Sequence, residues 1–350
     1  MNALLDRATR SIRQHWTRLH ARSAAHRQRE ETVRLAVERL VDQANPRLRA
    51  VSGYRRKLFE ATAACLDYCH ALAQRIPGPV TLDRPAWGTD PVLNALFGDW
   101  ERVRQVISGP PVRAFVQETP LATDDCYAIL AALPLRRNQL GMELVGDDIH
   151  RDVQQTVLTF VNHDVGLPGP DEDSVRARAA QAIMDTLVSV AVAEIAVQEE
   201  RIEELEDRLR ILRIKRKSVT PSPHGLDFLH DGSAAHATEY ETLTRRIGED
   251  EQALAEAQVG LATLDDYLHR LNAILAEPER WIGARTERVV LDRMNVVRES
   301  GDTREAQEAT FLRGYRAGQP GRVLLLVRFK RADMIPASER LAEIERFMSV

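Results

Sequence analysis

Apolar side chains recur in steps of three and four through residues 172–276, in two runs separated by a segment rich in Pro, Gly and His. An ordinary surface helix repeats every 3.6 residues, whereas a repeat of 3.5 residues is needed only where helices pack lengthwise on each other. We therefore predict two long antiparallel helices, with a break between residues 218 and 238, that form a coiled-coil hairpin. The predicted seam consists of Met184, Val188, Ala191, Ile195, Gln198, Ile202, Leu205, Leu209 and Leu212 in the first helix and Leu243, Ile247, Asp250, Leu254, Ala257, Leu261, Leu264, Leu268, Leu271 and Leu275 in the second.

The charges that flank this seam favour one register of the hairpin. A tip centred near position 227 places Glu206 beside Glu251 and Arg208 beside Arg246, which are two like-charge contacts. Slipping one helix by a heptad centres the tip near position 231 and places Arg213 beside Glu251 instead. Exposed ion pairs are worth only ~0.2–1 kcal/mol each, so charge decides only between registers of equal apolar burial. We predict the slipped register for an isolated hairpin, or else a second chain that supplies the opposite charges.

Two stretches on either side of the hairpin alternate apolar and polar residues, which is the period of a β-strand. Residues 126–162 and residues 286–331 each predict three antiparallel strands. We place turns at 136–138 and 146–148 in the first group and at 319–321 in the second, where turn-forming residues occur. Three strands alone leave unpaired edges, whereas six strands in one sheet cover each other, so we expect a single sheet.

The other segments are predicted to be mainly helical. Residues 2–44 have a helical pattern, Asn45 and Pro46 form the start signal of a second helix, and a last helix is expected after Ser338. The predicted fold class is α+β, with N-terminal helices, an antiparallel sheet built from two groups of three strands, and a long inserted antiparallel coiled-coil hairpin. The predicted domains are residues 1–120 as an N-terminal helical region with a Pro-rich connector, residues 121–170 with 285–350 as the α+β body, and residues 171–284 as the hairpin insertion.

Composition and hydropathy narrow the classes of protein to consider. The longest stretch without an acidic or basic residue has eleven residues, 153–163, whereas a membrane-spanning helix needs about 20 apolar residues. The first thirty residues alternate Arg with apolar residues, unlike a secretory signal. Three cysteines do not suggest a disulfide framework. We expect a cytoplasmic protein without a transmembrane segment, and its preference for Arg over Lys is typical of a GC-rich, bacterial-like coding sequence.

Positive charge is concentrated in two places. Residues 1–29 contain seven Arg and one Asp, and this amphipathic segment is consistent either with binding to an anionic membrane or nucleic acid, or with packing on the next helix of the same chain. The second concentration lies at the end of the first long helix, where cations could meet an acidic partner or simply complement the helix dipole. The candidate partner-binding residues are Arg7, Arg10, Arg13, Trp16, Arg18, Arg22, Arg213, Lys215, Arg216 and Lys217.

Catalytic and metal-binding motifs are not evident. The sequence has no phosphate-binding glycine loop, HExxH, paired CxxC or GxSxG motif. Cys65 and Cys69 lie one helical turn apart with His70 adjacent, but we interpret the thiols as buried packing residues. An acidic turn at 147–152 and the pair at 163–164 would lie at opposite ends of one strand, about 35 Å apart at ~3.3 Å per residue, and could not share an ion. We therefore predict no catalytic residue, cofactor or metal ligand.

Three functions remain to be weighed. The first is a non-enzymatic interaction or scaffold protein that binds a protein partner, or a second copy of itself, through the coiled-coil arm. The alternative is a protein that binds nucleic acid or an anionic surface through the Arg-rich N-terminal helix and the basic hairpin tip. It lacks the aromatic residues that interleave with cations in single-strand binders, since Trp16 alone stands among the N-terminal Arg residues. An enzyme is the weakest interpretation, because it rests on the acidic turn alone.

Overall fold

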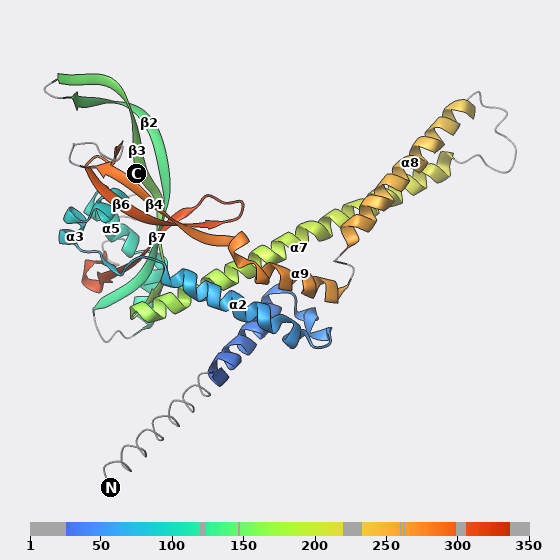
Figure 1. Cartoon of the computed structure of the whole chain (residues 1–350), viewed down its shortest axis with the longest axis horizontal. Helices are drawn as coiled ribbons and strands as arrows, with labels where there is room; N and C mark the ends of the chain where they lie inside the picture. The colour runs from blue at the N-terminus through green and yellow to red at the C-terminus, as the bar shows by residue number, and fades with distance from the viewer. Residues whose placement is uncertain are drawn as a thin grey trace, which may run out of the picture. The chain divides into compact units, whose positions relative to one another are not determined.

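The computed structural model describes residues 26–119, 124–145, 148–219, 233–259, 261, 263–298 and 306–336. The chain divides into two compact units. A helical unit comprises Met1–Cys65 and Asp185–Glu277, and a sheet unit comprises Leu66–Met184 and Pro278–Val350. Helix α2 (Tyr54–Gln74) and helix α7 (Glu172–Val219) each run from one unit into the other. The α+β class predicted from the sequence is confirmed (Figure 1).

The sheet unit contains one sheet in which the strands before and after the hairpin are joined. Its order is β3-β2-β7-β6-β4-β5, with antiparallel neighbours throughout, and β1 adds a short parallel pairing to β7. The two groups meet where β2 pairs with β7, from Asp125 opposite Lys330 to Ala132 opposite Val323. The prediction of a single sheet is therefore confirmed. The strands are β1 (Val80–Thr81), β2 (Asp125–Val145), β3 (Asp148–Gly169), β4 (Ile282–Asp292), β5 (Val297–Arg298), β6 (Ala306–Arg316) and β7 (Arg322–Lys330).

The first group has two long strands where we expected three. The predicted turn at 136–138 is wrong, because β2 continues through it and Asn138 pairs with Thr156 of β3, whose hydroxyl donates to the Asn138 side chain at 3.0 Å. Long strands of this kind bend at β-bulges, and the β2–β3 register shifts at three places. Asp152 and Asn162 have positive φ on β3. The predicted turn at 146–148 is consistent with β2 ending at Val145 and β3 beginning at Asp148.

The sheet curls so that strands distant in its order touch. The rings of Phe160 on β3 and Phe311 on β6 are 5.2 Å apart, although β2 and β7 lie between them in the sheet. Val157 of β3 also bridges Val296, close to the opposite edge of the sheet at β5. The concave face therefore encloses apolar side chains, as in a partly closed barrel.

Four short helices pack on this core in the stretch that we expected to be a connector. Leu93, Phe97 and Ile107 are buried in the same cluster as the sheet residues. Aspartate side chains start three of the helices by accepting backbone N–H groups, at Asp83, Asp90 and Asp99. Proline lies in the first turn of α3, α4 and α6, where no backbone N–H is needed, so the prolines of this stretch are compatible with helix starts. The helices are α3 (Arg84–Thr89), α4 (Pro91–Leu96), α5 (Trp100–Ile107) and α6 (Pro110–Glu118).

Within the helical unit, the helix at residues 26–44 packs by its apolar stripe. Val33, Val37, Leu40 and Val41 are all buried, so the packing interpretation is confirmed for this half of the N-terminal segment. Residues 1–25 lie outside the described residues, as does the helix expected after Ser338.

The start signal at Asn45 opens a shorter helix than we predicted. Asn45 caps the 3₁₀ helix η1 (Pro46–Ala50), and its side chain accepts from the backbone of Arg47. The predicted continuous helix from this point is wrong, because α2 begins only at Tyr54. Gly53 has a φ of +70°, a left-handed conformation that interrupts a right-handed helix between the two.

The hairpin consists of one unbroken helix and a return arm in two pieces. Helix α7 has 48 residues, α8 spans Ser233–Gln258 and α9 spans Leu264–Ala276. The expectation of a continuous return helix is wrong. Thr263 adopts an extended conformation and forms a reciprocal capping box with Asp266, which starts a new helix. Helix α7 ends at Val219 and α8 begins at Ser233, five residues before the predicted end of the break, and residues 220–232 lie outside the described residues.

By length and composition, α7 is the one helix among the described residues that could cross a membrane. The most apolar part of α7 also has packing partners within the protein. Val188, Ala191 and Ile195 are buried, and Asp185 accepts hydrogen bonds from Arg39 at 2.9 Å and Gln43 at 3.1 Å. A core helix of this kind meets the same criteria of length and hydropathy.

Candidate partner-binding site on the helical arm

Helices α7 and α8 lie side by side and antiparallel, and we call residues 194–219 of α7 together with residues 238–258 of α8 the arm (Figure 1). Arg213 donates to Glu251 at 2.8 Å, and Gln258 donates to Glu206 at 3.2 Å. Both contacts correspond to the same offset between the helices, which is that of the slipped register. The register predicted from flanking charges is therefore confirmed, and the alternative contact of Glu206 with Glu251 is not formed.

The predicted seam positions face inward along the arm. Leu205 and Leu209 of α7 and Leu243 and Ile247 of α8 are buried, and none of the other seam positions is exposed. The polar seam residue Asp250 has a side chain that is only 17% exposed and lies 3.7 Å from the guanidinium of Arg208. This ion pair satisfies a carboxylate that would otherwise be costly to bury.

The cations near the tip differ in their surroundings. Arg213 is held by Glu251, and Arg210 lies 3.0 Å from Asp207 on its own helix. Lys215 and Lys217 are exposed in the last turns of α7, where positive charge complements the helix dipole. The arm therefore keeps exposed cations at its end, in the place that the sequence indicated for a partner-binding site.

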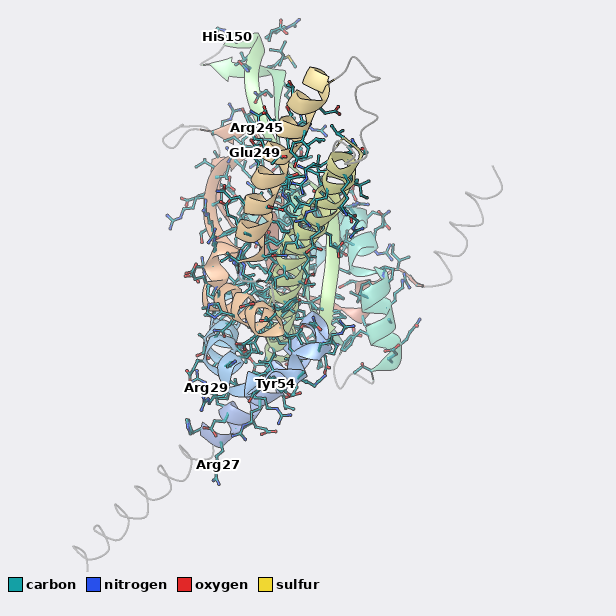
Figure 2. The ribbon with its side chains drawn as sticks, turned by 90° about the vertical axis from the view of Figure 1, so that its right-hand side faces the viewer. Arg27, Arg29, Tyr54, His150, Arg245 and Glu249 are labelled. Carbon is teal, nitrogen blue, oxygen red and sulfur yellow. The ribbon has the colours of Figure 1, made fainter. Side chains whose placement is uncertain are left out.

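Charge on α8 is mostly negative over its described side chains. Residues 238–258 contain six acidic residues and two arginines, a net charge of −4. Arg245 and Glu249 lie one turn apart on its surface, 3.9 Å from each other, with both side chains about 70% exposed (Figure 2). The α7 side of the arm tip is thus basic and the α8 side acidic, so the two sides would attract different partners.

Apolar residues on the outer side of α7 were missed in the sequence. Val197 is 64% exposed, Ile211 is 54% exposed and Ile214 is 63% exposed, although each is a β-branched aliphatic residue. Ile211 and Ile214 are off the heptad seam, so α8 does not cover them, and Val197 precedes Glu206, which is beside the last residue of α8. The available signal was that positions two residues after a seam residue, such as Val197 after Ile195, are normally polar in a two-helix pair. These three exposed aliphatic side chains therefore distinguish the outer side of α7 from its buried seam.

The first six candidate residues of the N-terminal segment, from Arg7 to Arg22, lie outside the described residues. The neighbouring described helix carries a charged cluster around Glu38, which accepts hydrogen bonds from Arg55 at 2.7 Å, Tyr54 at 2.8 Å and Arg49 at 3.3 Å. The bond from Arg55 contributes most to lowering the pKa of Glu38 below its ordinary value of 4.5.

Replacing Glu38 by glutamine is therefore expected to lower the thermal unfolding temperature at pH 7. Because the pKa of Glu38 is depressed in the folded chain, its contribution is present above pH 4.5 and is lost as pH falls through the lower folded value. The difference between Glu38→Gln and the parent chain should then shrink toward pH 3. Calorimetry across this range tests it, with Glu31→Gln, an exposed residue on the same helix, as the control. An unchanged difference at low pH would contradict the prediction.

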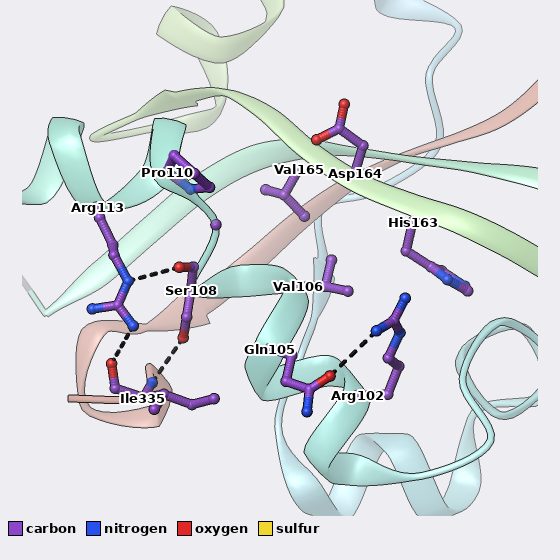
Figure 3. Close-up of a pocket in the computed structure, with 11 residues that line it drawn as sticks. Arg102, Gln105, Val106, Ser108, Pro110, Arg113, His163, Asp164, Val165 and Ile335 are labelled. Atoms are coloured by element: carbon purple, nitrogen blue, oxygen red, sulfur yellow. Dashed lines mark hydrogen bonds between the residues drawn. The ribbon is translucent and has the colours of Figure 1, made fainter. Parts of the chain in front are cut away.

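One hollow in the sheet unit lies between α5, α6 and β3 and has a volume of about 400 Å³ (Figure 3). His163 lines it, with Nε2 2.7 Å from the carbonyl of Leu96 and its ring stacked on Phe97, and burial lowers the pKa of this imidazole. Arg113 donates to the carbonyls of Ser108 and Ile335 at 2.7 and 2.6 Å. These groups bind the chain to itself, so we assign the hollow no reaction.

The other residues weighed for metal binding are not brought together. His150 lies near the turn between β2 and β3 (Figure 2), and His163 is thirteen residues further along β3, about 43 Å at ~3.3 Å per residue. Cys65 and Cys69 are fully buried in α2, whereas His70 is exposed. The prediction that the two thiols are buried packing residues is confirmed.

Comparison with known proteins leaves the arm as the main guide to function. No protein-family model matches the chain, and no solved structure matches its fold.

Proposed function

We propose that this chain is a non-enzymatic interaction protein whose arm binds a protein partner. The observation that carries the proposal is the outer face of α7, where Val197, Ile211 and Ile214 are each more than half exposed between charged residues. A mixture of apolar and charged groups on one helix face is the composition of a protein-binding surface. We further propose that α7 and α8 pack as a coiled coil, which would make the arm stiff enough to present this face.

The length of the arm supports this role. Residues 194–219 of α7 extend over about 39 Å at ~1.5 Å per residue. Seam residues need only each other for burial, and they do not require the outer face to be apolar. A helix pair that served only to fold the chain would place polar residues at Val197 and Ile211, as it does at Glu204 between them.

Photo-crosslinking in cells tests the proposal. A photoreactive residue at Lys215 is expected to give one defined adduct, identified by mass spectrometry, that disappears when Ile211 and Ile214 are both replaced by serine. The same reagent at Arg288, which is 75% exposed on β4, is the matched control and should not give that adduct. Adducts that are equal at both positions, or that survive the double serine replacement, would contradict a binding role for this face.

The alternative is binding to nucleic acid or to an anionic membrane surface through the basic end of α7 and the Arg-rich N-terminal segment. Six basic residues and no acidic residue in 208–217 support it. In the same crosslinking experiment it would appear as adducts that nuclease digestion or lipid extraction removes. The apolar residues on the outer face favour a protein partner, because polyanion contacts use cations and backbone groups.

A further inference from the structure

The two halves of the arm part of α7 carry opposite charge. Residues 194–207 contain seven acidic residues and one basic residue, a net charge of −6, and residues 208–217 carry a net charge of +6. A second α7 placed antiparallel to the first brings each basic half against an acidic half. We propose that the partner of the arm is a second copy of this chain, bound antiparallel through the outer face of α7. This proposal rests on the proposed role of the arm in protein binding.

A two-fold axis at position 204 gives self-complementary contacts. It places each residue before 204 opposite the partner's residue at the same distance after 204, as an isologous interface requires. Val197 then meets the partner's Ile211, and Glu200 meets the partner's Arg208. Arg201 likewise meets the partner's Asp207. Each contact occurs twice, and only the two Glu204 side chains on the axis form a like-charge contact.

Apolar contacts select this axis over the neighbouring one. Moving the axis half a heptad toward the tip, between positions 207 and 208, also places acidic residues opposite basic ones. It would, however, place Val197 opposite the partner's Ser218 and Ile211 opposite the partner's Glu204. Only the axis at 204 covers both exposed aliphatic side chains with each other, and this burial adds to the charge attraction.

The residues involved are available for such contacts. Arg201, Asp207 and Arg208 have side chains that are 54%, 66% and 52% exposed, and Glu200 is exposed as well. Arg201 and Asp207 form exposed ion pairs within the chain, which exchange at little cost. Arg208 lies 3.7 Å from the less exposed Asp250, but its own side chain is 52% exposed and can contact the partner's Glu200 while it stays beside Asp250. Glu200 and Arg208 are eight residues apart on one helix, about 12 Å, so they cannot pair within a chain.

Reversing charges in the purified full chain tests the interface. The parent chain is expected to sediment as a concentration-dependent dimer whose dissociation constant rises with salt. Arg201→Glu alone, or Asp207→Arg alone, should raise that constant about tenfold or more, because two pairs become repulsive. The chain carrying both changes should regain the parent value within about threefold, since the two-fold axis restores both pairs. If the double variant dimerised as weakly as the single variants, the proposal would be overturned.

Cysteine crosslinking tests the axis independently of affinity. A chain with both Val197→Cys and Ile211→Cys is expected to form a disulfide-linked dimer under mild oxidation. Each single variant should not, because its two cysteines would lie about 21 Å apart across the axis. Cys65, Cys69 and Cys126 are fully buried and do not compete. Equal dimer formation by the single and double variants would refute this axis.

The two experiments separate this inference from the proposed function. A monomeric parent chain that still gives an arm-specific adduct with a different protein in cells would overturn the second-copy proposal and leave the binding role intact. A monomeric chain without such an adduct would overturn both.

Discussion

Replacing Arg176 by methionine is expected to lower the free energy of unfolding of the sheet unit by about 3–5 kcal/mol. This guanidinium is only 7% exposed and donates to the backbone carbonyls of Ala73, Ile76 and Gly78 at 2.9, 3.0 and 3.3 Å, with a further bond to Gln74 at 3.3 Å. The last carbonyls of a helix have no N–H partner within the helix. Here the Arg176 side chain supplies donors to carbonyls at the end of α2 and just after it. Methionine would fill a similar volume but remove the donor of the Gln74, Ile76 and Gly78 oxygens, whereas the Ala73 oxygen would keep its bond from the backbone N–H of Ile76 at 3.2 Å.

Urea unfolding followed by tryptophan fluorescence measures this effect, since Trp87, Trp100 and Trp281 all belong to the sheet unit. Arg288→Met is the control, because Arg288 is 75% exposed and lies 3.7 Å from Glu308 in a surface pair. It should change stability by less than about 1 kcal/mol. A loss of the same small size for Arg176→Met would show that the buried carbonyls do not depend on this side chain.

Replacing Gly78 by alanine is expected to lower the free energy of unfolding of the sheet unit by about 2–5 kcal/mol, since backbone strain and overpacking each contribute. Gly78 has a φ of +121°, which side-chain-bearing residues rarely adopt, and an added Cβ would lie 2.2 Å from the carbonyl oxygen of Leu326. That oxygen belongs to the backbone of β7, which is also held to this loop by the bond from Leu326 N to Pro77 O at 2.8 Å. Neither the strand nor the loop can move away without losing this contact.

The same urea titration tests this prediction, with Gly88→Ala as its control. An added Cβ at Gly88 has no neighbour within 4 Å, and Gly88 lies in helix α3, where alanine is the better helix former by about 1 kcal/mol. Gly88→Ala should therefore be neutral or stabilising. A Gly78→Ala chain as stable as the parent would mean that the loop relaxes, contrary to the close approach to β7.

Features whose cause lies within a segment could be predicted from the sequence. The heptad repeat marks which side of α7 and α8 is buried, and alternation marks β6 and β7, because periodicity is a property of each segment alone. The slipped register could also be predicted, because the charges beside the seam of each helix are known from the sequence and only this register pairs Arg213 with Glu251. At the candidate site, the basic tip could be predicted from the run of Arg and Lys. The exposed Val197 and Ile211 were not predicted, although both lie outside the seam positions.

Tertiary structure alone decided the features that depend on distant residues. Nothing near Arg176 in the sequence shows that α2 would end against it, and nothing near Asn138 shows that Thr156 would hold it in a strand. The short helices α3 to α6 became part of the core because the curled sheet offered them an apolar face, which no single segment encodes. Local patterns specify which surface of an element must be buried, and the long-range packing of the chain decides what covers it.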